Sequence, residues 1–287
     1  MDEKQLSLQS AVRELSRPGV DPAGKICRLL SLAGTAVLAK RLGCSRLEVE
    51  TAALESGIIP ERYHRNIGTV GIAGQLALLR SHAFIAGAGG LGGLVIELLA
   101  RMGVGRLTVI DDDSFCESNL NRQLLALEKD LGCGKAPAAS RRVSEVNGSV
   151  ELMARRCRGD SGSLAGMLGD CRVALDCLDN LPSRFALEQA CQKHGIPLVH
   201  GAVAGFTGQV AVIWPGEPLF KLIYGSGSAH HGAEIHLGNP APTPAMIASW
   251  QASEAVKILA GLPCTTRGRL LIIDMLSGET TPIQLIP

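Results

Sequence analysis

The sequence predicts an α/β protein with a doubly wound, mostly parallel, Rossmann-like sheet and an N-terminal helical extension. From His82 onward, short apolar runs of strand length alternate with stretches of helical periodicity. A glycine-rich turn follows the first of these runs and opens a helix. Hydrophobic residues make up 46% of the 287 residues, which is enough for a sizeable core. We therefore divide the chain into a small helical N-terminal region, residues 1–60, and one large domain, residues 61–287.

The N-terminal region is expected to contain three short helices. Apolar residues predict the first two at 26–32 and 37–42. Ser45 and Glu48 have the spacing of a capping box, so a third helix is expected after Ser45, ending near Gly57. A DNA-reading helix-turn-helix would carry more basic residues, so we favour an accessory or dimerisation unit.

In the large domain, the pattern predicts a series of strands and intervening helices. Strands are expected at residues 82–86, 106–110, 150–154, 172–175 and 197–200, and helices at 91–102, 135–145, 182–193 and 246–259. Two later runs, 208–214 and 269–274, follow irregular spacing, so antiparallel pairing is expected there. Residues 215–244 are rich in Gly, Pro, Ser and His and are interpreted as a long crossing loop. For His230, His231 and His236 in this loop, a solvated or substrate-facing position is favoured over a metal site.

Composition excludes several classes of partner. A net charge of +1 shows no basic excess that would indicate nucleic acid. The polar start MDEKQLSLQS lacks a signal-peptide core, and the apolar runs are too short to span a bilayer. The nine cysteines include no C-x-x-C pair, so no structural zinc site is expected. A soluble, cytoplasmic protein with reduced thiols is the resulting expectation.

The glycine-rich turn, Gly87-Ala88-Gly89-Gly90-Leu91-Gly92, predicts nucleotide binding. Glycines let backbone N–H groups approach a phosphate, and the following helix adds the positive end of its dipole. Asp111 ends the next strand, where a carboxylate accepts hydrogen bonds from ribose hydroxyls. This pattern alone does not distinguish NAD, FAD and ATP.

Charged residues near the turn favour ATP. Arg122 and Lys135 can neutralise a triphosphate and the departing pyrophosphate, whereas hydride transfer has no evident use for them. Asp179 follows a buried strand at the carboxyl edge of the sheet and is a candidate ligand for Mg²⁺, which polarises the phosphates. Asn180 and Arg184 extend the same polar group.

These motifs resemble the ThiF/MoeB/HesA proteins of the ubiquitin-activating-enzyme superfamily. The resemblance runs from Arg62 to about Ala260 and rests on motifs in family order. They are R-Y-H-R-N at 62–66, G-Q-x-x-L at 74–78, G-A-G-G-L-G at 87–92, the D-x-D strand end at 111–113, S-N-L-N-R-Q at 118–123, G-C-G-K at 132–135, D-C-L-D-N at 176–180 and the glycine run ending in G-Q-V at 208–210.

The resemblance implies an ATP- and Mg²⁺-dependent adenylyltransferase. Its acceptor would be the C-terminal carboxylate of a ubiquitin-like sulfur-carrier protein, in thiamine, molybdopterin or related cofactor biosynthesis. Nucleotide-binding residues would be Gly87, Gly89, Gly90, Gly92, Asp111, Asp113, Asn119, Arg122, Gln123 and Lys135. The catalytic residues would be Arg65, Arg122, Lys135 and Asp179. Asp179 would also bind Mg²⁺, and Arg65 would reach into the partner's site of a homodimer.

The chain departs from the family pattern in ways that keep other functions open. The two C-x-x-C pairs that many members use for zinc are missing, and so is a cysteine on the crossing loop for a covalent step. Adenylation without covalent transfer is therefore favoured. The alternatives are an NAD- or FAD-dependent oxidoreductase, a non-catalytic nucleotide- or carrier-binding module, and adenylation of a small-molecule carboxylate.

Overall fold

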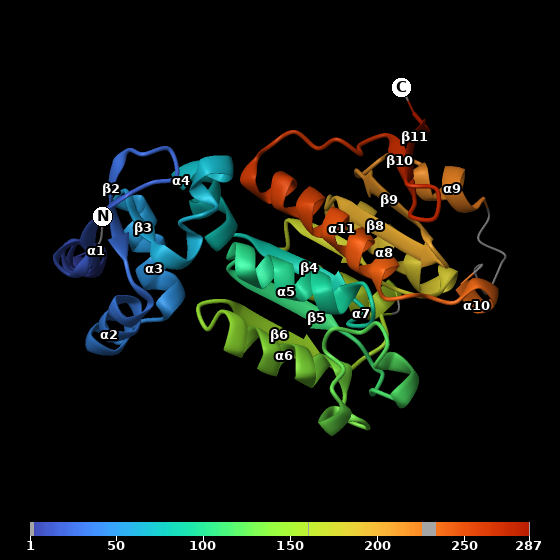
Figure 1. Ribbon diagram of the computed structural model, residues 1–287, viewed down its shortest axis with the longest axis horizontal. Helices are drawn as coiled ribbons and strands as arrows, with labels where there is room; N and C mark the ends of the chain where they lie inside the picture. Colours follow the sequence, from blue (N-terminus) through green and yellow to red (C-terminus); the bar gives the residue numbers. More distant parts are fainter. Residues whose placement is uncertain (1–2, 160, 226–233, 287) are drawn as a thin grey trace.

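The computed structural model describes residues 3–159, 161–225 and 234–286, and its centre is an eight-stranded sheet (Figure 1). The strand order is β11-β10-β9-β8-β7-β4-β5-β6. The strands are β4 (His82–Ala86), β5 (Arg106–Ile110), β6 (Glu151–Arg155), β7 (Val173–Asp176), β8 (Leu198–Ala204), β9 (Thr207–Ile213), β10 (Arg269–Asp274) and β11 (Glu279–Gln284). Strands β4 to β8 pair in parallel, whereas β9, β10 and β11 are joined antiparallel, as expected for the two later runs.

Helices cover both faces of this sheet, which confirms the doubly wound class. Neighbouring residues of β4 face opposite sides: Ile85 belongs to one buried apolar cluster and Phe84 to another. The Ile85 cluster draws on helices α4 (Ile67–Leu79), α5 (Gly92–Met102), α6 (Lys135–Val146) and α11 (Pro242–Ala260). The Phe84 cluster draws on α7 (Ser161–Leu168), α8 (Leu181–His194) and α9 (Leu219–Tyr224).

The N-terminal region is a mixed α/β unit at one end of the molecule (Figure 1). Its elements are α1 (Glu3–Leu15), β1 (Arg17–Val20), β2 (Ile26–Leu30), α2 (Leu32–Leu42), α3 (Arg46–Glu55) and β3 (Ile58–Pro60). The helix expected at 26–32 is wrong, because β2 is the central strand between antiparallel β1 and parallel β3. The capping box is confirmed: Ser45 Oγ accepts from the Glu48 amide, and Glu48 accepts from the Ser45 amide.

A buried polar junction joins this unit to the sheet domain. The hydroxyl of Tyr63 donates to Glu50 Oε2 and accepts from Asn147 Nδ2, both at 3.0 Å. The Tyr63 ring fills the space beside Gly103, where a Cβ atom would lie 2.5 Å from the ring. Gly103 and Asn147 end α5 and α6, so the junction lies at the edge where the parallel strands begin.

The segment interpreted as one long crossing loop contains two short helices, α9 and α10 (Glu234–Leu237), and the interpretation is wrong to that extent. His236 is exposed in α10, whereas His230 and His231 lie outside the described residues. No helix in the described part of the chain has the length and apolar character needed to cross a membrane.

Candidate functional site

A cavity of about 600 Å³ opens at the carboxyl edge of β4, β5 and β7. The glycine turn between β4 and α5 forms its floor, and Gly87, Gly89 and Gly90 line it. Gly87 has φ +94°, and its amide donates to Ile110 O at 2.9 Å. The N-terminus of α5 has no side-chain cap, so its backbone N–H groups suit an anion in the cavity.

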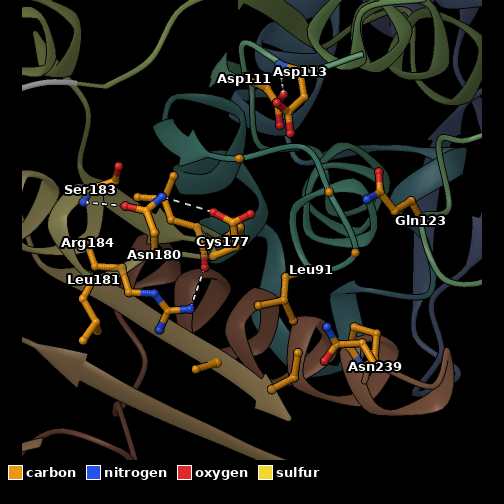
Figure 2. A pocket seen from close by; sticks show the side chains of 18 of the residues that line it. Leu91, Asp111, Asp113, Gln123, Cys177, Asn180, Leu181, Ser183, Arg184 and Asn239 are labelled. Atoms are coloured by element: carbon orange, nitrogen blue, oxygen red, sulfur yellow. Dashed lines mark hydrogen bonds between the residues drawn. The ribbon is translucent and has the colours of Figure 1, made fainter. Parts of the chain in front are cut away.

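Asp111 fixes one side of the turn. Its carboxylate accepts from the backbone N–H groups of Ala88 at 2.7 Å and Asp113 at 2.8 Å. Burial raises the pKa of Asp111 more than these hydrogen bonds and Lys135 lower it. Carboxylate oxygens of Asp111, Asp112 and Asp113 lie within 4.8 Å of one another, the only group of three or more acidic, His or Cys ligands found among the described residues. Figure 2 shows Asp111 and Asp113 together above the turn.

Cationic and amide side chains line the same wall. Lys135 begins α6, and its Nζ donates to Asp113 Oδ2 at 2.8 Å while only 8% of its side chain is exposed. Arg122 is held by hydrogen bonds from Nη1 to Ser118 O and Asn121 Oδ1. Gln123 is buried and lines the cavity, and its Oε1 has no hydrogen-bond partner among the described residues.

The β7–α8 segment supplies the opposite wall. Asn180 caps α8 by accepting from the Ser183 amide, and its Nδ2 donates to Asp179 Oδ1 at 3.1 Å (Figure 2). The Asp179 carboxylate is therefore oriented at the cavity rim. Arg184 donates to Leu178 O at 2.6 Å, which keeps its guanidinium against this wall.

The structure brings most of the predicted site residues together around one cavity. Its lining includes Gly87, Gly89, Gly90, Asp111, Asp113, Arg122, Gln123, Lys135 and Asp179. Three predicted residues do not line it, namely Gly92, Asn119 and Arg65.

Two of these three support the site instead of lining it, and the third lies elsewhere. A Cβ atom on Gly92 would lie 1.8 Å from Gly87 O, so Gly92 lets the turn close. Asn119 is buried, and its Oδ1 accepts from the Cys116 amide, which shapes the segment leading to Arg122. Arg65 is exposed just beyond Tyr63, near the edge where the strands begin.

Sequence reasoning missed the residues that enter the cavity from β9, α9 and the chain before α11. Gln209, Tyr224 and Asn239 line it, as does Arg158, which pairs with Asp112 at 2.9 Å. The G-Q-V motif signals Gln209, whereas no local pattern signals the other three.

Two of the nine cysteines, Cys157 and Cys177, line the cavity. None of the nine forms a disulfide, and Cys177, the one between the two aspartates of D-C-L-D-N, is buried with its pKa raised well above the ordinary value by burial. Cys116 and Cys133 are exposed and do not line the cavity.

The fold and the cavity define a nucleotide-binding protein of the doubly wound α/β class, with a cationic and carboxylate-lined site. The chain belongs to the ThiF family, whose family model matches residues 63–287.

The match between this chain and its named relatives spans most of the length of each relative. The chain is 35% identical over 235 residues to the SAMP-activating enzyme E1 of Haloferax volcanii. The aligned region covers 79% of this chain and 86% of that protein. It is 36% identical to a sulfur carrier protein adenylyltransferase of Thermus thermophilus, over 76% of this chain and 84% of that protein. It is 32% identical to the molybdopterin-synthase adenylyltransferase of Escherichia coli, over 78% of this chain and 92% of that protein.

Solved structures share the fold at lower identity. The crystal structure of E. coli MccB with ATP matches with a TM-score of 0.66 and 19% identity, covering 88% of this chain and 82% of that chain. The crystal structure of PaaA matches with a TM-score of 0.66 and 21% identity, covering 79% of this chain and 82% of that chain.

Proposed function

We propose that this protein is an ATP-dependent adenylyltransferase that joins AMP to the C-terminal carboxylate of a ubiquitin-like sulfur-carrier protein. The relatives named as adenylyltransferases support this proposal. The observation that carries it is the convergence of the glycine turn, Arg122, Lys135 and Asp179 on one cavity. A hydride-transferring enzyme has no need for this set of charges.

The reaction follows from what these residues can bind. Backbone amides of the turn and the N-terminus of α5 bind phosphate oxygens, while Lys135 and Arg122 neutralise their charge. A carboxylate oxygen of the acceptor attacks the α-phosphorus, the bond to the β-phosphate oxygen breaks, and pyrophosphate leaves. The carboxylate is already a nucleophile, so positioning and charge neutralisation supply most of the catalysis.

Mg²⁺ is part of this proposal. The carboxylates of Asp179 and of the Asp111–Asp113 group are the hard oxygen ligands that Mg²⁺ prefers, and they face the same cavity. When bound, the ion would neutralise phosphate charge. Asp113 already pairs with Lys135, so Asp179 is the better candidate for a direct ligand.

A homodimer completes the proposed site. Arg65 is exposed and lies near the amino ends of the strands, so it does not reach the cavity of its own chain. An arginine finger from one protomer into its partner's cavity is consistent with that position. We also propose a cytoplasmic setting, in keeping with nine cysteines that form no disulfide, and a role in thiamine, molybdopterin or related cofactor synthesis.

ATP–pyrophosphate exchange tests the proposal. Wild-type protein should exchange labelled pyrophosphate into ATP only when a ubiquitin-like carrier ending in Gly-Gly is added. Arg122→Ala and Asp179→Ala should each lower the rate at least about a hundredfold. Arg172→Ala, which changes an exposed arginine away from the cavity, is the matched control and should keep the wild-type rate.

Two results would contradict the proposal. Exchange that depends on a small carboxylic acid instead of a carrier would move the acceptor to a metabolite. Nucleotide binding without exchange for any acceptor would make the protein a binding module.

A further inference from the structure

A buried polar cluster borders the cavity on the side away from the glycine turn. It contains Asp176, Arg184, His200, Gln209 and Tyr224, contributed by β7, α8, β8, β9 and α9. The side chains of Asp176 and His200 are fully buried, and His200 Nδ1 lies 2.7 Å from Asp176 Oδ2. Arg184, Gln209 and Tyr224 line the cavity itself. None of the steps above uses Gln209, His200 or Tyr224.

The charges in the cluster fix the histidine tautomer. Burial works to raise the pKa of Asp176, but Arg184 and the hydrogen bond from His200 outweigh it and leave that pKa below its ordinary value. Burial lowers the pKa of His200 more than Asp176 raises it, so the ring is neutral at pH 7. Its single proton is on Nδ1, donated to the carboxylate, and Nε2 is therefore an acceptor.

This tautomer sets the direction of the next hydrogen bonds. The Tyr224 hydroxyl lies 2.9 Å from His200 Nε2 and donates its proton there. The Tyr224 oxygen then has only lone pairs to offer. It accepts from Arg184 Nη1 at 3.0 Å and from Gln209 Nε2 at 2.7 Å.

The orientation of the Gln209 amide follows from the same contacts. Its nitrogen lies beside two acceptors, the Tyr224 oxygen and His200 Nε2 at 3.1 Å. The reversed amide would place Oε1 against the unprotonated His200 nitrogen, which is repulsive. Oε1 is therefore on the side of the amide away from the cluster, on a side chain that lines the cavity, and no described residue donates to it.

We propose that Tyr224, oriented by the Asp176–His200 pair, is a positioning residue that turns the Gln209 carbonyl toward the acceptor, where it accepts the last peptide N–H of a carrier's C-terminal tail. This inference rests on the proposed adenylation of a carrier protein. The acceptor class it implies is an extended peptide, because a free carboxylic acid has no N–H at that place. Ala202, the small residue of β8 that pairs with Gln209 of β9, lines the cavity and leaves room for such a tail beside Gln209.

The test pairs a protein variant with a carrier variant. Tyr224→Phe keeps the ring, which packs on His200 and Phe220, but removes the hydroxyl that orients Gln209. The carrier variant is a semisynthetic protein in which the last peptide N–H is replaced by an ester oxygen. Carrier-dependent ATP–pyrophosphate exchange then gives separate KM values for carrier and for ATP.

We expect each change alone to raise the KM for the carrier about tenfold, the loss of one hydrogen bond worth ~1.4 kcal/mol. The KM for ATP should change by less than about twofold, since the nucleotide side of the cavity is untouched. Together the changes should cost little more than either alone, because both remove the same contact. Gln209→Met should behave like Tyr224→Phe.

The second tyrosine supplies a matched control. Tyr63→Phe also removes a buried hydroxyl, but at the junction with the N-terminal unit, at the opposite edge of the sheet. It should lower stability without changing the KM for the carrier, which separates positioning from a general effect on folding.

Different failures have different meanings. If the wild type shows no carrier-dependent exchange, the proposed function and this inference fall together. If the wild type is active but the two changes multiply to about a hundredfold, or if the KM for ATP rises as much as that for the carrier, only the role given to Tyr224 and Gln209 is wrong.

Discussion

Replacing Gly87 with alanine tests whether the glycine turn positions the nucleotide. Gly87 has φ +94°, and a Cβ atom there would lie 2.6 Å from Cys177 O. Ordinary contact begins at 3.4 Å, so the turn and the end of β7 must separate by about 0.8 Å. Both are tied in place, because the Gly87 amide donates to Ile110 O and the Cys177 amide donates to Ala86 O. The strain therefore falls on the amides that face the cavity.

The magnitude follows from that displacement. A misplacement of about 1 Å at a reacting group costs roughly a hundredfold in rate, so Gly87→Ala should lower ATP–pyrophosphate exchange by about that factor. The left-handed backbone itself costs about 1–2 kcal/mol when alanine replaces glycine.

Gly43→Ala isolates the second effect. Gly43 caps α2 with φ +62°, and a Cβ atom there meets nothing within 4 Å. Exchange kinetics and urea denaturation should show that Gly43→Ala lowers stability by ~1–2 kcal/mol but keeps the exchange rate. The reasoning is refuted if folded Gly87→Ala protein exchanges within about threefold of the Gly43→Ala rate.

Three further changes give distinct results. Lys135→Met should lower the initial rate of ATP–pyrophosphate exchange by about 10²–10³-fold, because a mostly buried cation acts on phosphate at low dielectric. A smaller loss would argue against direct contact between Lys135 and the phosphates. Tyr63→Phe should cost ~1–3 kcal/mol in urea denaturation, because Glu50 and Asn147 lose a buried partner; an unchanged midpoint would contradict that. Because folding lowers the pKa of His200, the unfolded state takes up more protons as pH falls below about 6.5, and stability should drop there. His200→Asn should flatten this slope between pH 7.5 and 5.5, and a steeper slope in the variant would show the sign is wrong.

The sequence predicts the central strands well because their surroundings leave little choice. Strands β4 and β5 are buried on both faces, so each is a continuous apolar run bounded by polar residues and turns, and both lie at the expected residues. The strand β2 was assigned wrongly for the opposite reason. Only Leu29 and Leu30 at its end are buried, and a run of five residues does not distinguish a strand period from a helix period. Its pairing with β1 and β3 depends on contacts that a local pattern does not contain.

The site divides in the same way. Residues next to the glycine turn or at a strand end, such as Asp111 and Asp179, reach the cavity because the topology of a parallel sheet brings strand ends together. Asn119 belongs to the same motif as Arg122, yet it only caps the backbone that carries Arg122. A motif therefore identifies the segment that forms the site without identifying which of its side chains bind the ligand.

The side of the cavity that we assign to the acceptor could not be predicted from local patterns, and the reason lies in how it is built. Tyr224 is 40 residues from Arg184 and 24 from His200, and no spacing rule relates them. They meet because β8 lies between β7 and antiparallel β9 in the sheet, and α8 and α9 pack on the same face of it. Nucleotide binding uses local turn and helix geometry and so leaves a mark in the sequence. The acceptor-binding surface that we propose is assembled from distant segments, so we expect differences in acceptor among relatives to lie there.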